Sequence, residues 1–338
     1  IGANWFHGGD DNPFFQWARE RYDLGPLNED HAERTRTVIR NGEDVTEEFE
    51  RNLALFEKAY EDFRKESADD ISMAALATRT GSAEVEQLAD YWATLWMAGD
   101  SAETVSASDF FDDPLGVGGW QLQNGISHVI RQMLADVLSR GVEIHLSEPV
   151  VEIGRDIGGV RVAAASGQVY TAQKAIVTAS IGVLKAGLIA FDDGVRRTLK
   201  EELDDVYMGN LFKIFVPVKE TFFTAHNIPD NYPVALVGEN PCFIHARTGG
   251  KPGITVFTGG QTAREMELWE LDDLRRFAHE AIDRTGLFEG YKDELAEDIV
   301  PTLWAGHPFY LGSYAVHKPG HKKMSLIDDL GVNFSYNM

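Results

Sequence analysis

GANWFHG, residues Gly2–Gly8, is the most informative stretch of this chain, and it stands at the very start. Two aromatic side chains and the titratable His7 lie between small residues at both ends. Small residues let a backbone pass close to a flat ring, and the following pair Gly8-Gly9 permits a sharp turn. Because the stretch begins at the second residue, with no Met and no strand before it, we interpret the sequence as one whose beginning is missing.

The composition is that of a globular protein with one large or two ordinary domains. The 338 residues are 43% hydrophobic and 25% charged, and 31 Lys and Arg stand against 54 Asp and Glu. The net charge of -23 argues against nucleic-acid binding, which requires a positive surface. An acidic surface attracts cationic substrates, but solubility or a salt-adapted source explains the charge more simply.

No apolar run approaches the roughly 18 residues that a membrane-spanning helix needs, so we expect a soluble protein. The cytoplasm is slightly favoured, and the compartment stays open. Cys242 is the single cysteine, which excludes an internal disulfide framework and disfavours a thiolate metal site. His317 and His321 have the spacing of a metal-binding pair on a helix, but Pro319-Gly320 between them forbids a helix, so no metal site is predicted.

The order of helical and β patterns predicts an α+β fold of two interleaved domains. Apolar residues recur at helical spacing, or a capped pattern occurs, in five stretches: Pro13–Tyr22, 45–65, 82–97, Ile126–Arg140 and Val195–Asp204. Short β-branched runs arrive in two batches: Val142–Leu146, Val150–Ile153, Val160–Ala165, Val169–Thr171 and Ala175–Ala179, then Leu211–Val218, Pro233–Val237, Cys242–Ala246 and Ile254–Thr258. Two further helices are expected over Ala263–Arg276 and Leu274–Thr285, with the boundary between them open.

Three motifs together resemble the FAD-dependent amine oxidase family, most of all its polyamine oxidases. GANWFHG is similar to a hallmark of those enzymes, and Val177–Lys185 is similar to their strand, turn and short helix beside the cofactor. Trp304-Ala305-Gly306-His307-Pro308, followed by Gly312-Ser313-Tyr314, is similar to the family pattern W-x-x-D-P-x-x-x-G-S-Y. Here His307 replaces the usual Asp, and Leu311 stands where Arg is common. The resemblance covers the chain from Gly2 to about Tyr314.

The resemblance implies a flavin amine oxidase-like two-domain fold with interleaved segments. No G-x-G-x-x-G occurs, so we expect the N-terminal Rossmann βαβ unit that holds the FAD phosphates, and the C-terminal FAD segment, to be missing. The expected division is a flavin-contacting loop and helix (1–27), the helical part of the substrate domain (28–115), an FAD-domain helix and β-meander (116–190), the substrate-domain mixed sheet with helices (191–318), and an unassigned tail (319–338).

Lys213 is the predicted catalytic residue. It stands in the middle of the apolar run Leu211–Phe215, where an ammonium without a partner is costly to bury. Because side chains alternate along a strand, one alternative is that Lys213 simply faces solvent together with Leu211 and Phe215. The resemblance implies instead that Lys213 holds a water against flavin N5, and burial would then lower its pKa.

The resemblance also assigns binding residues. His7 is expected to face the substrate and Tyr314 to align it as one aromatic wall, whereas on local grounds His7 could cap a turn, and Tyr314 and Trp304 could be core aromatics. Val151 is expected to contact the adenine through its main chain, although locally it reads as an ordinary core valine. The predicted cofactor-binding residues are Gly2, Ala3, Asn4, Trp5, Val151 and Trp304.

The implied function is FAD-dependent oxidation of a small cationic, polyamine-like amine to an imine, with O2 reoxidising the flavin and giving hydrogen peroxide. Two alternatives stay open. One is a non-catalytic, truncated relative that binds no FAD. The other is a related flavin amino-acid oxidase, which would want an arginine for the substrate carboxylate, and the sequence offers no obvious candidate. The sequence leaves the oligomeric state and the identity of the amine open.

Overall fold

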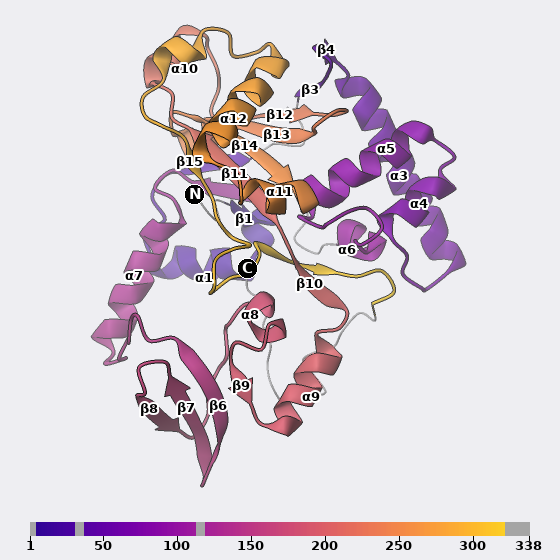
Figure 1. The fold of residues 1–338 in the computed structure, drawn as a ribbon. Helices are drawn as coiled ribbons and strands as arrows, with labels where there is room; N and C mark the ends of the chain where they lie inside the picture. The colour runs from indigo at the N-terminus through magenta and orange to yellow at the C-terminus, as the bar shows by residue number, and fades with distance from the viewer. Residues whose placement is uncertain (1–4, 31–36, 113–118, 322–338) are drawn as a thin grey trace.

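The structure, a computed structural model, describes residues 5–30, 37–112 and 119–321. Within these residues the strands form four sheets, and the largest, of seven strands, lies in the upper part of Figure 1. Its strands run in the order β15 (Val300–Pro301), β11 (Leu211–Val216), β14 (Ile254–Gly259), β13 (Cys242–Ala246), β12 (Tyr232–Leu236), β3 (Thr37–Arg40) and β4 (Glu43–Asp44). Neighbours are antiparallel except β12 and β3.

The seven-stranded sheet is covered on both faces. Phe212 and Ile214 of β11 point into a core shared with α10 (Glu220–Ala225), α11 (Gly260–Met266) and α12 (Leu271–Thr285). Leu211 and Phe257 point the other way, into a core shared with the helical region. The expected alternation along β11 is therefore present, but neither face of the strand meets solvent.

The helical region consists of α3 (Thr46–Glu66), α4 (Met73–Arg79), α5 (Ala83–Tyr91) and α6 (Ala107–Phe111). Its core is aromatic: the fully buried rings of Phe56 and Trp92 stack with centroids 5.1 Å apart. Ser72 and Ser82 accept hydrogen bonds from backbone N–H groups at the starts of α4 and α5, which satisfies donors that a helix end leaves free. The expected helix over 82–97 is present, but after Tyr91 it widens into one π-helical turn, η2 (Trp92–Trp96).

Three smaller sheets complete the fold. β5 (Gly119–Leu122) lies between β1 (Trp5–His7) and β2 (Leu27–Asp30), against α1 (Pro13–Arg21) and α7 (Ile126–Ser139). At the bottom of Figure 1 are β8 (Val169–Ala172), β7 (Gly159–Ala164), β6 (Val150–Asp156) and β9 (Ala190–Phe191), near α8 (Ile181–Lys185) and α9 (Asp193–Glu202). The third small sheet is the pair of β10 (Val206–Gly209) and β16 (Tyr314–His317). The described residues also form three short 3-10 helices: η1 (Gly9–Asp11), η3 (Thr248–Gly250) and η4 (Tyr291–Glu294).

Two expected strands are absent from the described structure. Val142–Leu146 and Ala175–Ala179 have no strand conformation, and their apolar side chains are open to solvent: Leu146 is 84% and Ile176 is 88% exposed. β-branched runs become strands when a neighbouring strand and a covering layer accept them, and no described residues provide either here.

One expected helix, Ala263–Arg276, is interrupted. α11 ends at Met266, and Glu270 begins α12 as its N-cap residue. Leu268, between the two helices, is 86% exposed, so no core requires a continuous helix there.

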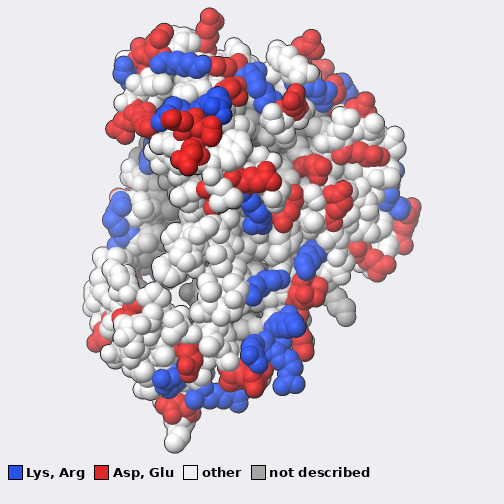
Figure 2. All heavy atoms as spheres, in the orientation of Figure 1, with Lys and Arg blue, Asp and Glu red and all other residues white. Residues whose placement is uncertain are grey.

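Charges on the face shown in Figure 2 are mixed in sign. Asp and Glu lie among Lys and Arg over α10–α12 and over the helical region, while the middle of this face carries few charges. This face therefore offers no single-sign patch that would steer a cation. Among the described helices, none is long and apolar enough to cross a bilayer.

His317 and His321 do approach each other, although no helix joins them. Their rings stack with centroids 4.5 Å apart, and they face Asp109 and Asp70 respectively. Over the described ranges, no group of three or more His, Cys, Asp or Glu residues could hold a metal ion. These contacts attach β16 to the helical region.

We predict that the His317–Asp109 contact makes stability fall as pH rises. The 3.0 Å hydrogen bond that His317 Nδ1 donates to the Asp109 carboxylate raises the pKa of His317 above 6.5 despite partial burial. The stabilisation is therefore complete below pH 6.5 and is lost as pH rises through the folded-state pKa. Asp109→Asn should remove about 1 kcal/mol of it and flatten the dependence of Tm on pH. The control His145→Gln, at an exposed site, should leave that dependence unchanged; an unchanged Asp109→Asn profile would contradict the prediction.

Candidate active site

Lys213 lies buried among aromatic rings in the middle of β11. Only 4% of the residue is exposed, and its Nζ stands over the rings of Phe257 and Trp5, 5.1 and 5.8 Å from their centroids. Burial lowers the pKa of Lys213 to about 8 because a desolvated ammonium is disfavoured. The alternative of a solvent-facing lysine is therefore wrong.

Trp5 and His7 reach this position from β1. The His7 ring stacks against the Trp5 indole, with centroids 6.2 Å apart and planes 22° from parallel. β1 can lie this close to β5 because Gly119 has φ +141° and no side chain; a Cβ there would stand 2.0 Å from the carbonyl oxygen of Phe6. The structure thus brings together the predicted site residues Trp5, His7 and Lys213. The predicted cofactor-binding residues Gly2, Ala3 and Asn4 lie outside the described residues.

Trp304 is held by a loop that one carboxylate organises. Glu267, just after α11, accepts hydrogen bonds from the backbone N–H groups of Trp304, Ala305 and Gly306, each 2.8 Å long. Asn210 Nδ2 donates a fourth, 3.2 Å long, to the same carboxylate. The loop is thereby tied to Asn210, which directly precedes β11 and lies three residues before Lys213.

Tyr314 is placed by the residue before it. Ser313 Oγ accepts a 2.7 Å hydrogen bond from the backbone N–H of Leu211, and the Ser313 N–H donates to the carbonyl of Gly209. Tyr314 itself pairs with Gly209 across the β10–β16 ladder and is 40% exposed. It is therefore not a core aromatic, and its position is fixed relative to the strand that carries Lys213.

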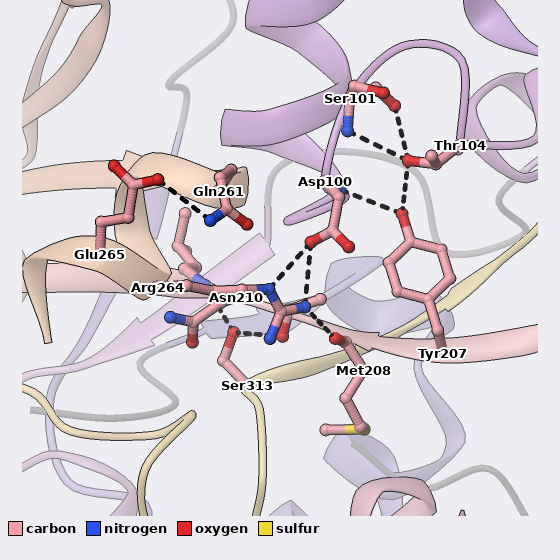
Figure 3. A network of polar contacts seen from close by, with 12 residues as sticks. Asp100, Ser101, Thr104, Tyr207, Met208, Asn210, Gln261, Arg264, Glu265 and Ser313 are labelled. Carbon is pink, nitrogen blue, oxygen red and sulfur yellow. Dashed lines mark hydrogen bonds and ion pairs between the residues drawn. The ribbon is translucent and has the colours of Figure 1, made fainter.

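A polar network in Figure 3 joins these strands to the helical region. The Arg264 guanidinium, from α11, bonds the Asp100 carboxylate at 2.9 Å and also the carbonyl of Met208 in β10. The Asp100 N–H donates to the hydroxyl of Tyr207, which also contacts Thr104. One ion pair thus fixes the loop after η2, helix α11 and strand β10 at a single point.

Val151 lies in the four-stranded sheet at the bottom of Figure 1, away from β11. It is the extra residue of a β-bulge: the ladder with β7 pairs Val150 and Glu152 and passes over Val151. A bulge leaves a residue's main chain outside the regular pairing. Val151 is also 41% exposed, so it is not a core valine, and its contact with adenine stays a prediction.

A family model described as flavin containing amine oxidoreductase matches residues 1–329. This chain belongs to that family. Similar curated proteins are polyamine oxidase 4 of Oryza sativa subsp. japonica, 28% identical over 232 residues, and polyamine oxidase 2 of Arabidopsis thaliana, 29% identical over 190 residues. These matches cover 65% and 54% of this chain but 43% and 36% of the relatives, so the chain spans less than half the length of the curated relatives it matches.

Solved putrescine oxidase structures have the same fold. The wild-type enzyme bound to putrescine gives a TM-score of 0.71 at 16% identity, covering 94% of this chain and 77% of that chain. The predicted α+β, flavin amine oxidase-like fold is confirmed, and membership of the family implies FAD as the cofactor. The residues around Lys213 fit the ring end of a flavin, because flat apolar walls from Trp5 and Phe257 flank a buried amine.

Sequence patterns missed three residues that build this site: Glu267, Arg264 and His245. Glu267 and Arg264 lie on the exposed side of a helical pattern, where charged residues are ordinary, and no local signal distinguishes them. His245 does carry a signal, since it stands inside the apolar strand run Cys242–Ala246, as Lys213 stands inside its own.

Glu267→Gln should loosen the Trp304 loop. The neutral amide accepts weaker hydrogen bonds than the carboxylate, so amide hydrogen exchange at residues 304–306 should speed up about tenfold. The matched control is Glu265→Gln, because Glu265 accepts from Gln261 and does not contact the loop. Equal exchange rates in the two variants would show that Glu267 does not hold the loop.

Lys213→Met should stabilise the protein at neutral pH. A pKa lowered from 10.5 to about 8 means that the folded state resists protonation, a cost of up to about 3 kcal/mol below pH 8. Between pH 8 and 10.5 the unfolded chain binds more protons, so the wild type gains stability and the advantage of the variant shrinks. The measurement is Tm against pH, with exposed Lys219→Met as the control. A loss of stability at pH 7 would contradict the predicted cost.

Proposed function

We propose that the protein of which this chain is part or whole is an FAD-dependent amine oxidase that converts a polyamine-like amine to an imine. The observation that carries the proposal is Lys213, buried with a pKa near 8 between two aromatic rings, in a chain of this family. The names of the curated relatives support a polyamine as the substrate class.

The side chains around Lys213 suit the neutral form of an amine. Apolar walls disfavour a charged ammonium, and only the neutral amine has the lone pair that assists loss of hydride from the adjacent carbon. Lys213, with its lowered pKa, can hold a water by a hydrogen bond while close to losing its own proton at neutral pH. His7 would contact the substrate chain, and Tyr314 would align the amine.

When bound, the flavin supplies the hydride acceptor, and O2 later removes the electrons and gives hydrogen peroxide. The protein supplies position and the exclusion of water. The Glu267 contacts hold the Trp304 loop, and Ser313 fixes Tyr314 against β11, so both side chains keep a constant place relative to Lys213.

The first alternative is a non-catalytic relative that binds no FAD, supported by the absence of a G-x-G-x-x-G motif from this sequence. A flavin amino-acid oxidase is the second. Arg264, the arginine of the Figure 3 network, is already engaged by Asp100 and the Met208 carbonyl, and so gives no support to carboxylate binding.

An absorbance spectrum between about 300 and 550 nm, recorded with added FAD and then with spermine under nitrogen, tests the proposal. We expect a retained flavin band that bleaches with spermine and returns on exposure to air with release of hydrogen peroxide. Failure to retain flavin would favour the non-catalytic alternative for this chain. Bleaching by amino acids in place of spermine would favour the amino-acid oxidase.

Lys213→Met should retain the flavin band but lower the rate of the reaction by about 100-fold or more, since a positioned proton-transfer group contributes 10²–10⁴-fold. The control Lys219→Met changes an exposed lysine and should react like the wild type. A fully active Lys213→Met variant with normal flavin content would remove Lys213 from the chemistry.

A further inference from the structure

His245 is a buried histidine, and only one of its two ring nitrogens has a hydrogen-bond partner among the described residues. It lies in β13 and is 1% exposed. Its Nδ1 makes a 2.8 Å hydrogen bond with Thr248 Oγ1, whereas Nε2 has no hydrogen-bond partner among the residues that the structure describes. Buried polar atoms are almost always paired, by protein, water or ligand, so the unpaired Nε2 calls for a partner beyond the described residues, such as a water or a ligand atom.

The His245 side chain shares a sheet face with Lys213. Lys213 pairs with Phe257 across β11 and β14, and Phe257 pairs with Phe243 across β14 and β13. Residues directly opposite each other point to the same face, and so does the residue two positions further along, which is His245. The Trp5 indole lies over both: Lys213 Nζ is 5.8 Å from its ring centroid, and the His245 ring meets it edge-on at the same distance.

His245 lies at a distance from Lys213 that suits a second group of one extended molecule. Two strand spacings and two residues along the strand separate their Cα atoms by roughly 12 Å. The rings of Trp5, Phe243 and Phe257 pack around these two side chains, and aromatic rings make favourable contacts with methylene chains and with the faces of cationic groups.

The imidazole is neutral at physiological pH. Burial, with the positive charge of Lys213, lowers the pKa of His245 to about 3. The Nδ1–Thr248 Oγ1 contact suits the tautomer in which Nδ1–H donates to the hydroxyl oxygen, and in that tautomer Nε2 carries a lone pair and acts as a hydrogen-bond acceptor. An acceptor without negative charge in an aromatic surrounding fits the N–H of an amine or ammonium group.

We propose that His245 is a substrate-binding residue whose Nε2 accepts a hydrogen bond from the amine nitrogen remote from the carbon that is oxidised. The proposal rests on the proposed oxidation of a polyamine-like amine and adds the residue that recognises the second nitrogen of such a substrate.

The direct test is the ring nitrogen resonance of His245 in protein labelled with 15N-histidine and loaded with FAD, assigned by its disappearance in His245→Gln. We expect a neutral ring whose Nε2 resonance moves saturably when putrescine or spermidine is added under nitrogen, and stays in place with butylamine, which lacks a second nitrogen. No movement with the diamine, or equal movement with butylamine, would overturn the proposal.

Kinetics supply the second test. His245→Phe removes the acceptor, keeps a ring at the Trp5 edge, and should raise the KM for spermidine about tenfold or more with little change in kcat. His245→Gln, which restores an acceptor, should recover part of this loss. Equal KM values for His245→Phe and the wild type would overturn the proposal while leaving the amine oxidase function standing. A wild type that no amine reduces would overturn both, so the two failures are distinguishable.

Discussion

The structure depends on a seven-stranded sheet that is covered on both faces. Because α10–α12 cover one face and the helical region with β1 covers the other, any polar side chain on β11, β13 or β14 is withdrawn from water. Lys213 and His245 are such residues, and their lowered pKa values are the result. The protonation of these two side chains is thus set by how the layers pack, more than by any charged neighbour.

Much of this arrangement could be predicted from the sequence, and the strands of the main sheet illustrate why. Leu211–Val218, Cys242–Ala246 and Ile254–Thr258 are short and apolar with clear turn signals between them, and each matches a strand of the main sheet to within two residues at either end. The site residues Trp5, His7 and Lys213 came from motifs, which encode close approach and unusual burial. These features are local, so a single sequence carries them.

What sequence could not give depends on partners distant in the chain. The run Val142–Leu146 has strand composition, but a strand also needs a neighbour, and composition does not say whether one is present. Glu267 acts on a loop 37 to 39 residues later, and nothing in its own surroundings marks it for that task. The break between α11 and α12 was missed for the same reason. Glu267, whose carboxylate accepts the hydrogen bonds from the Trp304 loop, is the C-cap residue of α11.

The ion pair between Arg264 and Asp100 has a consequence for anyone who exchanges parts between relatives of this fold. It unites three segments that are far apart in sequence: the loop after η2, α11 and β10, with β16 attached through Ser313. A graft that brings in one segment alone would separate a donor from its acceptor in this network. The three segments therefore have to be exchanged together, although they are encoded by three separate parts of the gene.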